Sequence, residues 1–286
     1  MSLQPRAASA QAPSGPPSGT PGAAPRPAMP RRYGAVNWSG LWAHAKRGLH
    51  VYFHYAMITI GGPAINALLF LAVFAISLGD ILDPGTAVPF THFVVPGIGM
   101  VMLVHQAFQQ AAFMILDDKL EGFIADTLMA PLSPLEIMVG YTLHAAFTAL
   151  VTGGLVTGAM ALITGLPLAA PWVVLGYAVL GALLFAGIGT LAGLWAERWE
   201  HYSAAETFLI LPLGILSGAF FSLDSVPETA RWLIALNPAY YVIEGFRSGF
   251  IGGARAGVGI PLLLCLIVAL WTCNWRLFAV GYKLKP

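Results

Sequence analysis

The segment LDDKLEGFIADTLMAPLSPLEIMVGY, residues 116–141, separates two long apolar runs and holds six of the 27 Asp, Glu, Lys and Arg residues of the chain. Leu120, Phe123, Ile124 and Leu128 share one face of a predicted short helix, which the APLSP sequence ends because proline cannot continue a helix. A simple interhelical connection needs about 2–8 residues. The segment therefore predicts an exposed amphipathic helix that docks another protein, with a capped interhelical loop as the alternative.

The composition indicates an integral membrane protein. The 286 residues are 57% hydrophobic and 9% charged, with a mean hydropathy of +0.74, whereas a soluble domain carries roughly 25% charged residues. The formal net charge of +1 gives no basic face for nucleic acid, so no nucleic-acid partner is expected.

Six apolar segments come near or exceed the roughly 20 residues that cross a bilayer as a helix. They are predicted at residues 55–78, 92–116, 135–164, 172–195, 203–222 and 258–280. The alternation typical of β-barrel strands is absent. The predicted fold class is therefore an all-α integral membrane protein with six transmembrane helices.

Two segments precede the first span. Residues 1–33 are rich in proline, alanine and glycine, which predicts a disordered cytoplasmic tail and leaves 34–286 as the transmembrane domain. Residues 37–54 combine tryptophans at helical spacing with Lys46 and Arg47. This pattern predicts an amphipathic helix that lies in the membrane interface.

The distribution of basic residues predicts the orientation. With the N-terminus inside, eleven Lys and Arg residues fall on the cytoplasmic side and three on the other. Because positively charged loops stay inside, both termini and residues 116–141 are expected in the cytoplasm.

The connection after the fifth predicted span is amphipathic but too polar to cross the membrane. Asn237 and Pro238 divide it, which predicts two re-entrant half-helices in the outer leaflet with their turn buried against protein. Glu244 and Arg247 are three residues apart on the second half-helix, so we expect them to neutralise one another.

Sequence motifs for catalysis or metal binding are absent. There is no GxxxxGK[ST], HExxH or CxxC motif, so we expect neither an ATP site nor a metal site on this chain. His50 and His54 have metal-ligand spacing but supply at most two of the ligands that a zinc site needs.

A polar patch on the second predicted span contains His105, Gln106, Gln109 and Gln110. It has two interpretations, a vestibule for a polar headgroup or ordinary interhelical hydrogen bonding. A transporter without an ATP site needs energy from another polypeptide or from an ion gradient. An ion-driven transporter would need a functional carboxylate or histidine in the membrane, such as His105. A polytopic membrane enzyme is disfavoured because no catalytic motif is clustered.

The chain resembles the permease subunits of ABC-2 type exporters, in particular the branch that exports drugs, nodulation factors and polysaccharides. The resemblance covers about residues 36–280 and includes the six-span plan. Its motifs are HFVVPGIGMVML at 92–103, LEGFIADTLMAPLSPLEIMVGY at 120–141, and LPLGILSGAFFSLDSVPETARWLIALNPAYYVIEGFRSGFIG at 211–252. The family often has an arginine and a glutamate before the leucine-rich part of the second motif. Lys119, Glu121 and Asp126 stand there with shifted spacing, so either acidic residue is a candidate for the partner contact.

The resemblance implies an exporter of an amphiphilic, lipid-linked or drug-like substrate in the inner membrane. It implies two separate ATPase subunits that carry ATP and magnesium, and a homodimer or a heterodimer with a similar permease. It assigns ATPase coupling to residues 120–131 and to two further cytoplasmic contacts, namely Leu120, Glu121, Phe123, Ile124, Asp126, Leu128, Pro131, Trp42, Lys46 and Arg198. With the polar patch included, the translocation pathway and outer gate comprise His105, Gln109, Phe208, Leu211, Phe220, Phe221, Pro238, Tyr240, Tyr241, Glu244 and Arg247.

Overall fold

The computed structural model describes four ranges of the chain, residues 37–78, 89–223, 226–252 and 259–284. The chain divides into two units, Met1–Ala35 and Val36–Pro286, and all described residues belong to the second. The tail predicted at 1–33 lies outside the described residues. Every element of regular structure in the four ranges is a helix.

Five helical segments in the described ranges are long and apolar enough to cross a membrane, so the chain is an all-helical membrane protein. The first is formed by α2 (Ala56–Thr59) continued by α3 (Gly61–Leu78). The others are α4 (Phe90–Leu120), α6 (Pro134–Thr164), α7 (Pro171–Trp195) and α12 (Ile260–Val280). Five of the six predicted spans are thereby confirmed as helices.

The helices α4, α6 and α7 pack against one another, and most of the buried apolar side chains come from them. Glycines permit this close approach. A Cβ atom at Gly189 of α7 would overlap the backbone oxygen of Phe108 in α4, and one at Gly193 would press on Ala112. Small residues at such crossings bring helix backbones into direct contact, as membrane packing requires.

The prediction of one continuous helix over 203–222 is wrong. One helical run of changing geometry ends early instead: α8 (Trp199–Ala205), the π-helix η1 (Glu206–Ile210) and α9 (Leu211–Ile215) follow one another without a gap, after which the backbone turns. Pro212 has no N–H to donate to the preceding turn, and its ring disfavours regular α-helical geometry there. Gly218, with φ of 73°, then takes a left-handed conformation that ends any helical continuation.

This broken segment, residues 199–219, nevertheless runs antiparallel to α4. At one end the Trp199 ring lies 5.1 Å from that of Phe113, and at the other Ala219 packs on the backbone of Gly97. Between Gly97 and Phe113, α4 rises about 24 Å. The segment therefore follows α4 over most of the thickness of a bilayer.

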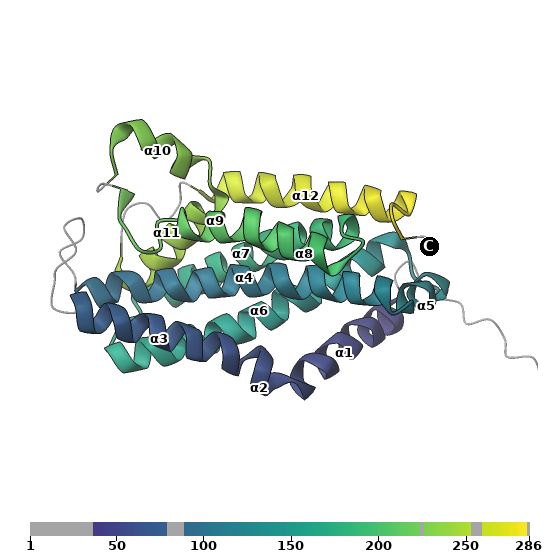
Figure 1. The fold of residues 1–286 in the computed structure, drawn as a ribbon, viewed down its shortest axis with the longest axis horizontal. Helices are drawn as coiled ribbons and strands as arrows, with labels where there is room; N and C mark the ends of the chain where they lie inside the picture. Colours follow the sequence, from purple (N-terminus) through teal and green to yellow (C-terminus); the bar gives the residue numbers. More distant parts are fainter. Residues whose placement is uncertain (1–36, 79–88, 224–225, 253–258, 285–286) are drawn as a thin grey trace, which may run out of the picture. The chain divides into compact units, whose positions relative to one another are not determined.

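The remaining helices lie at the two ends of the bundle (Figure 1). The end that carries α5 (Phe123–Met129) also holds the start of α1 (Trp38–His54) and the end of α12; we call it the α5 end. The opposite end, the α11 end, holds α10 (Glu228–Ala235) and α11 (Pro238–Ile251). Asn237 separates these two helices, which confirms the predicted break.

Candidate functional site

The short helix α5 is held in place by its inner face. It starts after Gly122, whose φ of 83° favours glycine. Ile124 is only 6% exposed and packs in a cluster with Ile115, Met138 and Phe278. Long-range packing thus turns this side chain into the bundle, and the contact of Ile124 with a partner protein stays a prediction that its burial does not support.

Several apolar side chains of α5 and of the residues just before it are exposed. Phe123 is 47% exposed, and together with three neighbours it forms a surface that we call the α5 patch, namely Leu120, Phe123, Leu128 and Met129. Glu121, Asp126 and Pro131 are also exposed around it. The exposed residues thus include every coupling residue predicted in this segment except Ile124, together with Met129, which helical spacing alone does not single out. Their contact with an ATPase stays a prediction.

A single carboxylate joins α1 to the connection between α5 and α6. The side chain of Glu136 accepts hydrogen bonds from the backbone N–H groups of Asn37 and Ser133. Asn37 in turn donates from Nδ2 to the Pro131 oxygen at 3.0 Å. The Ser133–Glu136 capping box follows an S-x-x-E signal that the sequence contains. The bond to Asn37, 99 residues away, has no local signal.

A second charged contact links α1 to α4, α5 and α6. Asp118 is buried, pairs with the Arg47 guanidinium and accepts a hydrogen bond of 2.6 Å from the Tyr141 hydroxyl. The guanidinium of Arg47 also lies 5.6 Å from the ring centre of Phe123. Sequence reasoning missed this arrangement, because its residues come from three distant segments.

The other predicted ATPase contacts are exposed. Trp42 and Lys46 project from α1, and Arg198 stands immediately before α8. Arg198 thus belongs to the turn between α7 and α8, which is separate in sequence from both α1 and α5.

The α7–α8 turn is joined to the C-terminal turn, Gly281–Leu284. Lys283 Nζ lies 2.6 Å from a carboxylate oxygen of Glu197 and donates to the Trp195 oxygen at 3.1 Å. The lysine hydrogen bond holds the pKa of the Glu197 carboxyl below its usual value. Leu284 is buried in the same cluster as Ile124. The C-terminal turn therefore connects the α7–α8 turn with the inner face of α5.

Lys119 points into the protein. Its Nζ donates to the backbone oxygens of Gly193, Leu194 and Ala196 at the end of α7. These carbonyls lack intrahelical donors, and a cation also complements the negative end of the helix dipole. Lys119 is thus a helix cap, which leaves Glu121 and Asp126 as the exposed charged residues of this segment.

A cavity of about 690 Å³ opens between α1, α2 and α4 near the α5 end. Ligand pockets typically enclose about 300–1,000 Å³. The walls combine aromatic and apolar side chains with a few polar groups, and they include Arg47, Tyr52, Tyr55, Gln109, Gln110, Phe113, Asp117, Asp118, Phe123, His144 and Tyr202.

The predicted polar patch on α4 meets Glu206 at the start of the π-helix. His105 Nε2 lies 3.0 Å from Glu206 Oε1, and Gln109 Nε2 donates to the same oxygen at 2.6 Å. Interhelical hydrogen bonding is thereby confirmed for His105 and Gln109. A role in binding a headgroup stays a prediction.

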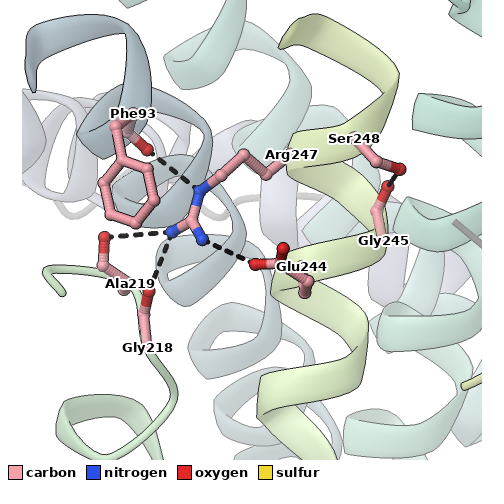
Figure 2. Close-up of polar contacts among 7 residues, drawn as sticks. All are labelled: Phe93, Gly218, Ala219, Glu244, Gly245, Arg247 and Ser248. Carbon is pink, nitrogen blue, oxygen red and sulfur yellow. Dashed lines mark hydrogen bonds and ion pairs between the residues drawn. The ribbon is translucent and has the colours of Figure 1, made fainter. Parts of the chain in front are cut away.

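Arg247 holds together three elements at the α11 end (Figure 2). The predicted pair with Glu244 is confirmed at 2.9 Å. In addition, Nε donates to the Phe93 oxygen at 3.1 Å, and Nη2 donates to the oxygens of Gly218 and Ala219 at 2.8 and 3.3 Å. The guanidinium also stacks 3.7 Å from the Phe93 ring centre. These backbone partners could not be found by sequence spacing.

The predicted gate residues fall into two groups. Near Arg247, Phe220 stacks on Phe74 with ring centres 5.6 Å apart, while Phe221 follows in the same turn. Pro238 starts α11, and the rings of Tyr240 and Tyr241 lie 5.4 Å apart. By contrast, an apolar stripe on the broken segment faces away from the bundle and consists of Phe208, Leu211 and Ile215.

Comparison with known proteins identifies the family. Residues 39–251 match the family model described as ABC-2 type transporter. The chain is similar to the inner membrane transport permease YadH of Escherichia coli K12, with 28% identity over 253 residues, which cover 87% of this chain and 97% of YadH. It is also similar to Nodulation protein J of Rhizobium leguminosarum bv. viciae, with 24% identity over 245 residues, 82% of this chain and 90% of that protein. This chain therefore belongs to the ABC-2 type transporter family, as a membrane permease and not an ATPase.

Proposed function

We propose that this chain is the membrane subunit of an exporter in the inner membrane that is driven by separate ATPase subunits. The α5 patch carries this proposal, because it presents exposed apolar side chains beside the exposed carboxylates of Glu121 and Asp126. An apolar surface rimmed by charged residues is typical of a protein interface. YadH, a permease of the inner membrane by its name, supports the location.

The way α5 is attached to the bundle suits the transmission of movement from a bound ATPase to the membrane helices. Its inner face is packed in a cluster that includes residues of α4, α6, α7 and α12. The Arg47–Asp118 pair joins α1 to the same end of α4. A displacement of α5 by an ATPase therefore moves several helices together, so that ATP binding and hydrolysis on the partner shift the membrane domain between two states.

Residues 199–223 form the sixth crossing in this proposal. Their antiparallel course along α4 supports it, since Trp199 and Ala219 lie about 24 Å apart along that helix. Six crossings keep both termini on the cytoplasmic side, in agreement with the basic residues. The α5 end then faces the cytoplasm and the α11 end faces outward.

A second permease covers the apolar stripe of Phe208, Leu211 and Ile215 in this proposal. Phe208 is 81% exposed. The stripe lies on the same segment as Glu206 and the outer turn. A homodimer or a heterodimer with a similar permease, bound to two ATPases, then encloses a pathway between the two broken segments. Lipid covers the remaining apolar surface.

The cavity near the α5 end is the entrance to that pathway. It combines aromatic walls with polar groups, which suits an amphiphilic, lipid-linked or drug-like substrate. From there, the pathway passes His105 and Gln109 at the middle of α4. It ends at the outer cluster around Phe220 and Arg247.

Co-purification tests the docking surface directly. The ATPase is first identified by its capture with the tagged permease from native membranes. Replacing Phe123 and Leu128 by Asp should weaken its binding more than about tenfold, because charges replace the apolar centre of the interface. Trp172→Asp, at an exposed aromatic side chain at the start of α7 and far from α5, is the matched control. Full binding and stimulation of the ATPase by the double variant would refute the assignment.

An ion-driven secondary transporter is the alternative function. The pair of His105 and Glu206, 3.0 Å apart among the helices, favours it because such pairs relay protons in membranes. Transport by the isolated chain under an ion gradient, abolished by His105→Ala, would support this alternative. Transport that requires the ATPase and persists without a gradient would exclude it.

A further inference from the structure

The cavity near the α5 end has an unequal set of charges. Among the described residues of its walls, the charged side chains are one arginine, Arg47, and two carboxylates, Asp117 and Asp118. Arg47 is paired with Asp118, which also accepts the Tyr141 hydroxyl hydrogen bond. Lys119, next along the chain, is directed to the end of α7. One of the two carboxylates therefore has no salt bridge of its own.

That carboxylate belongs to Asp117. It is only partly exposed, and no salt bridge or side-chain hydrogen bond joins it to a described residue. Arg47, which is bound to Asp118, attracts it from a distance, whereas the neighbouring Asp118 and Glu121 repel it. A partly buried carboxylate that shares one cation with a second carboxylate is unfavourable, and a positive ligand removes this penalty. The position is thus suited to the charged group of a cationic ligand.

The aromatic walls suit the same ligand. Tyr55 is 54% exposed and Phe113 is 47% exposed, and both line the cavity together with Tyr202. Aromatic faces attract cations through their quadrupoles and also cover apolar surface. Arg47 already lies over Phe123, so at least one ring of this cavity has a cation beside it.

We propose that this cavity binds a cationic amphiphile, with the Asp117 carboxylate as the counter-ion of its charged group and the aromatic rings against its apolar part. The inference rests on the proposed function, because it specifies the substrate class at the entrance of the pathway. An anionic headgroup is disfavoured for two reasons. The Arg47 guanidinium that would hold it is already bound to Asp118. In addition, the headgroup would place a further negative charge next to the carboxylates of Asp117 and Asp118.

Two probes of nearly equal shape and opposite charge test the proposal. Tetraphenylphosphonium is the cation and tetraphenylborate the anion. Their binding to the full-length chain in phosphatidylcholine nanodiscs is measured by equilibrium dialysis, with empty nanodiscs as the reference for lipid partition. No ATPase is needed, so the result is independent of the docking experiment.

The wild-type chain should bind the cation above the lipid reference and the anion no more than the reference. Asp117→Asn should weaken binding of the cation about tenfold, the effect of losing one close charge pair. Asp117→Glu should restore most of the cation binding that Asp117→Asn loses. This result would show that the loss comes from the missing charge and not from misfolding. Glu200→Gln, at an exposed carboxylate of α8 outside the cavity walls, should change nothing.

Equal binding of the two probes, or unchanged cation binding in Asp117→Asn, would overturn the inference. Preferential binding of the anion would also overturn it and would indicate a site organised by Arg47. If the cation fails to bind while the Phe123 and Leu128 variant loses its ATPase, only the substrate class is wrong. If the cation binds as expected and the Phe123 and Leu128 variant still binds the ATPase, the cavity assignment is supported and the coupling assignment is wrong.

Discussion

Among single residues, the buried charges connect segments that are remote in the sequence. Glu136 binds the backbone at Asn37, and Arg247 binds the backbone at Phe93 and Gly218. Asp118 binds the side chains of Arg47 and Tyr141. Loss of one partner leaves a buried charge uncompensated, which costs about 3–5 kcal/mol. These residues therefore specify how the helices are assembled.

Arg247 gives the sharpest prediction among single residues. Arg247→Met should lower the free energy of unfolding by about 3–5 kcal/mol, because Glu244 and three backbone oxygens lose their donor. Arg247→Lys should recover only part of this, since an ammonium group lacks the planar fork. Thermal unfolding in detergent measures both. Arg276→Met, at an exposed position of α12, should have little effect, and an equal loss in that control would contradict the role of Arg247.

Among the elements, the sequence predicted the helices better than their contacts. The long spans follow from apolar length, and the break at Asn237 and Pro238 follows from local chemistry. The inward side of α5 could not be predicted in this way. Helical spacing places Phe123 and Ile124 on one face, but Ile124 is buried because distant residues of α12 and the C-terminal turn pack on it.

The broken segment was unpredictable for a related reason. Hydropathy over 203–222 is that of a span, and a single proline is tolerated in membrane helices. The π-helix at Glu206–Ile210 instead accompanies the pairing of Glu206 with His105 and Gln109. Such tertiary contacts are invisible to a local pattern. The same holds for the turn at Gly218, whose backbone oxygen is bound by Arg247.

The C-terminal turn is expected to stabilise the α5 end. Leu284 is 2% exposed in the cluster that holds Ile124, so Leu284→Ala should cost about 2–5 kcal/mol. Limited proteolysis should then cleave the α5 segment faster. Val280→Ala, at a position that is 80% exposed, is the matched control. Identical unfolding temperatures and cleavage rates for the two variants would show that Leu284 does not support α5.

At the scale of the whole molecule, two exposed surfaces of the described residues are proposed to bind partners. The α5 patch lies at one end and the Phe208 stripe runs along the broken segment. Between them lie the cavity and the Glu206 cluster, so an ATPase at the first surface and a permease at the second would enclose the proposed pathway. In this proposal, the function of the chain depends on contacts with an ATPase and with a second permease.

The central claim is that an ATPase binds the α5 patch, and site-specific photocrosslinking tests it most directly. The photoreactive phenylalanine analogue p-benzoyl-phenylalanine replaces Phe123 in one variant and Trp172, which is 83% exposed at the other end of the bundle, in another. Irradiation of the assembled complex should join the ATPase to position 123 and not to position 172. A complex that contains the ATPase but forms no crosslink from position 123, or forms it equally from position 172, would contradict the claim.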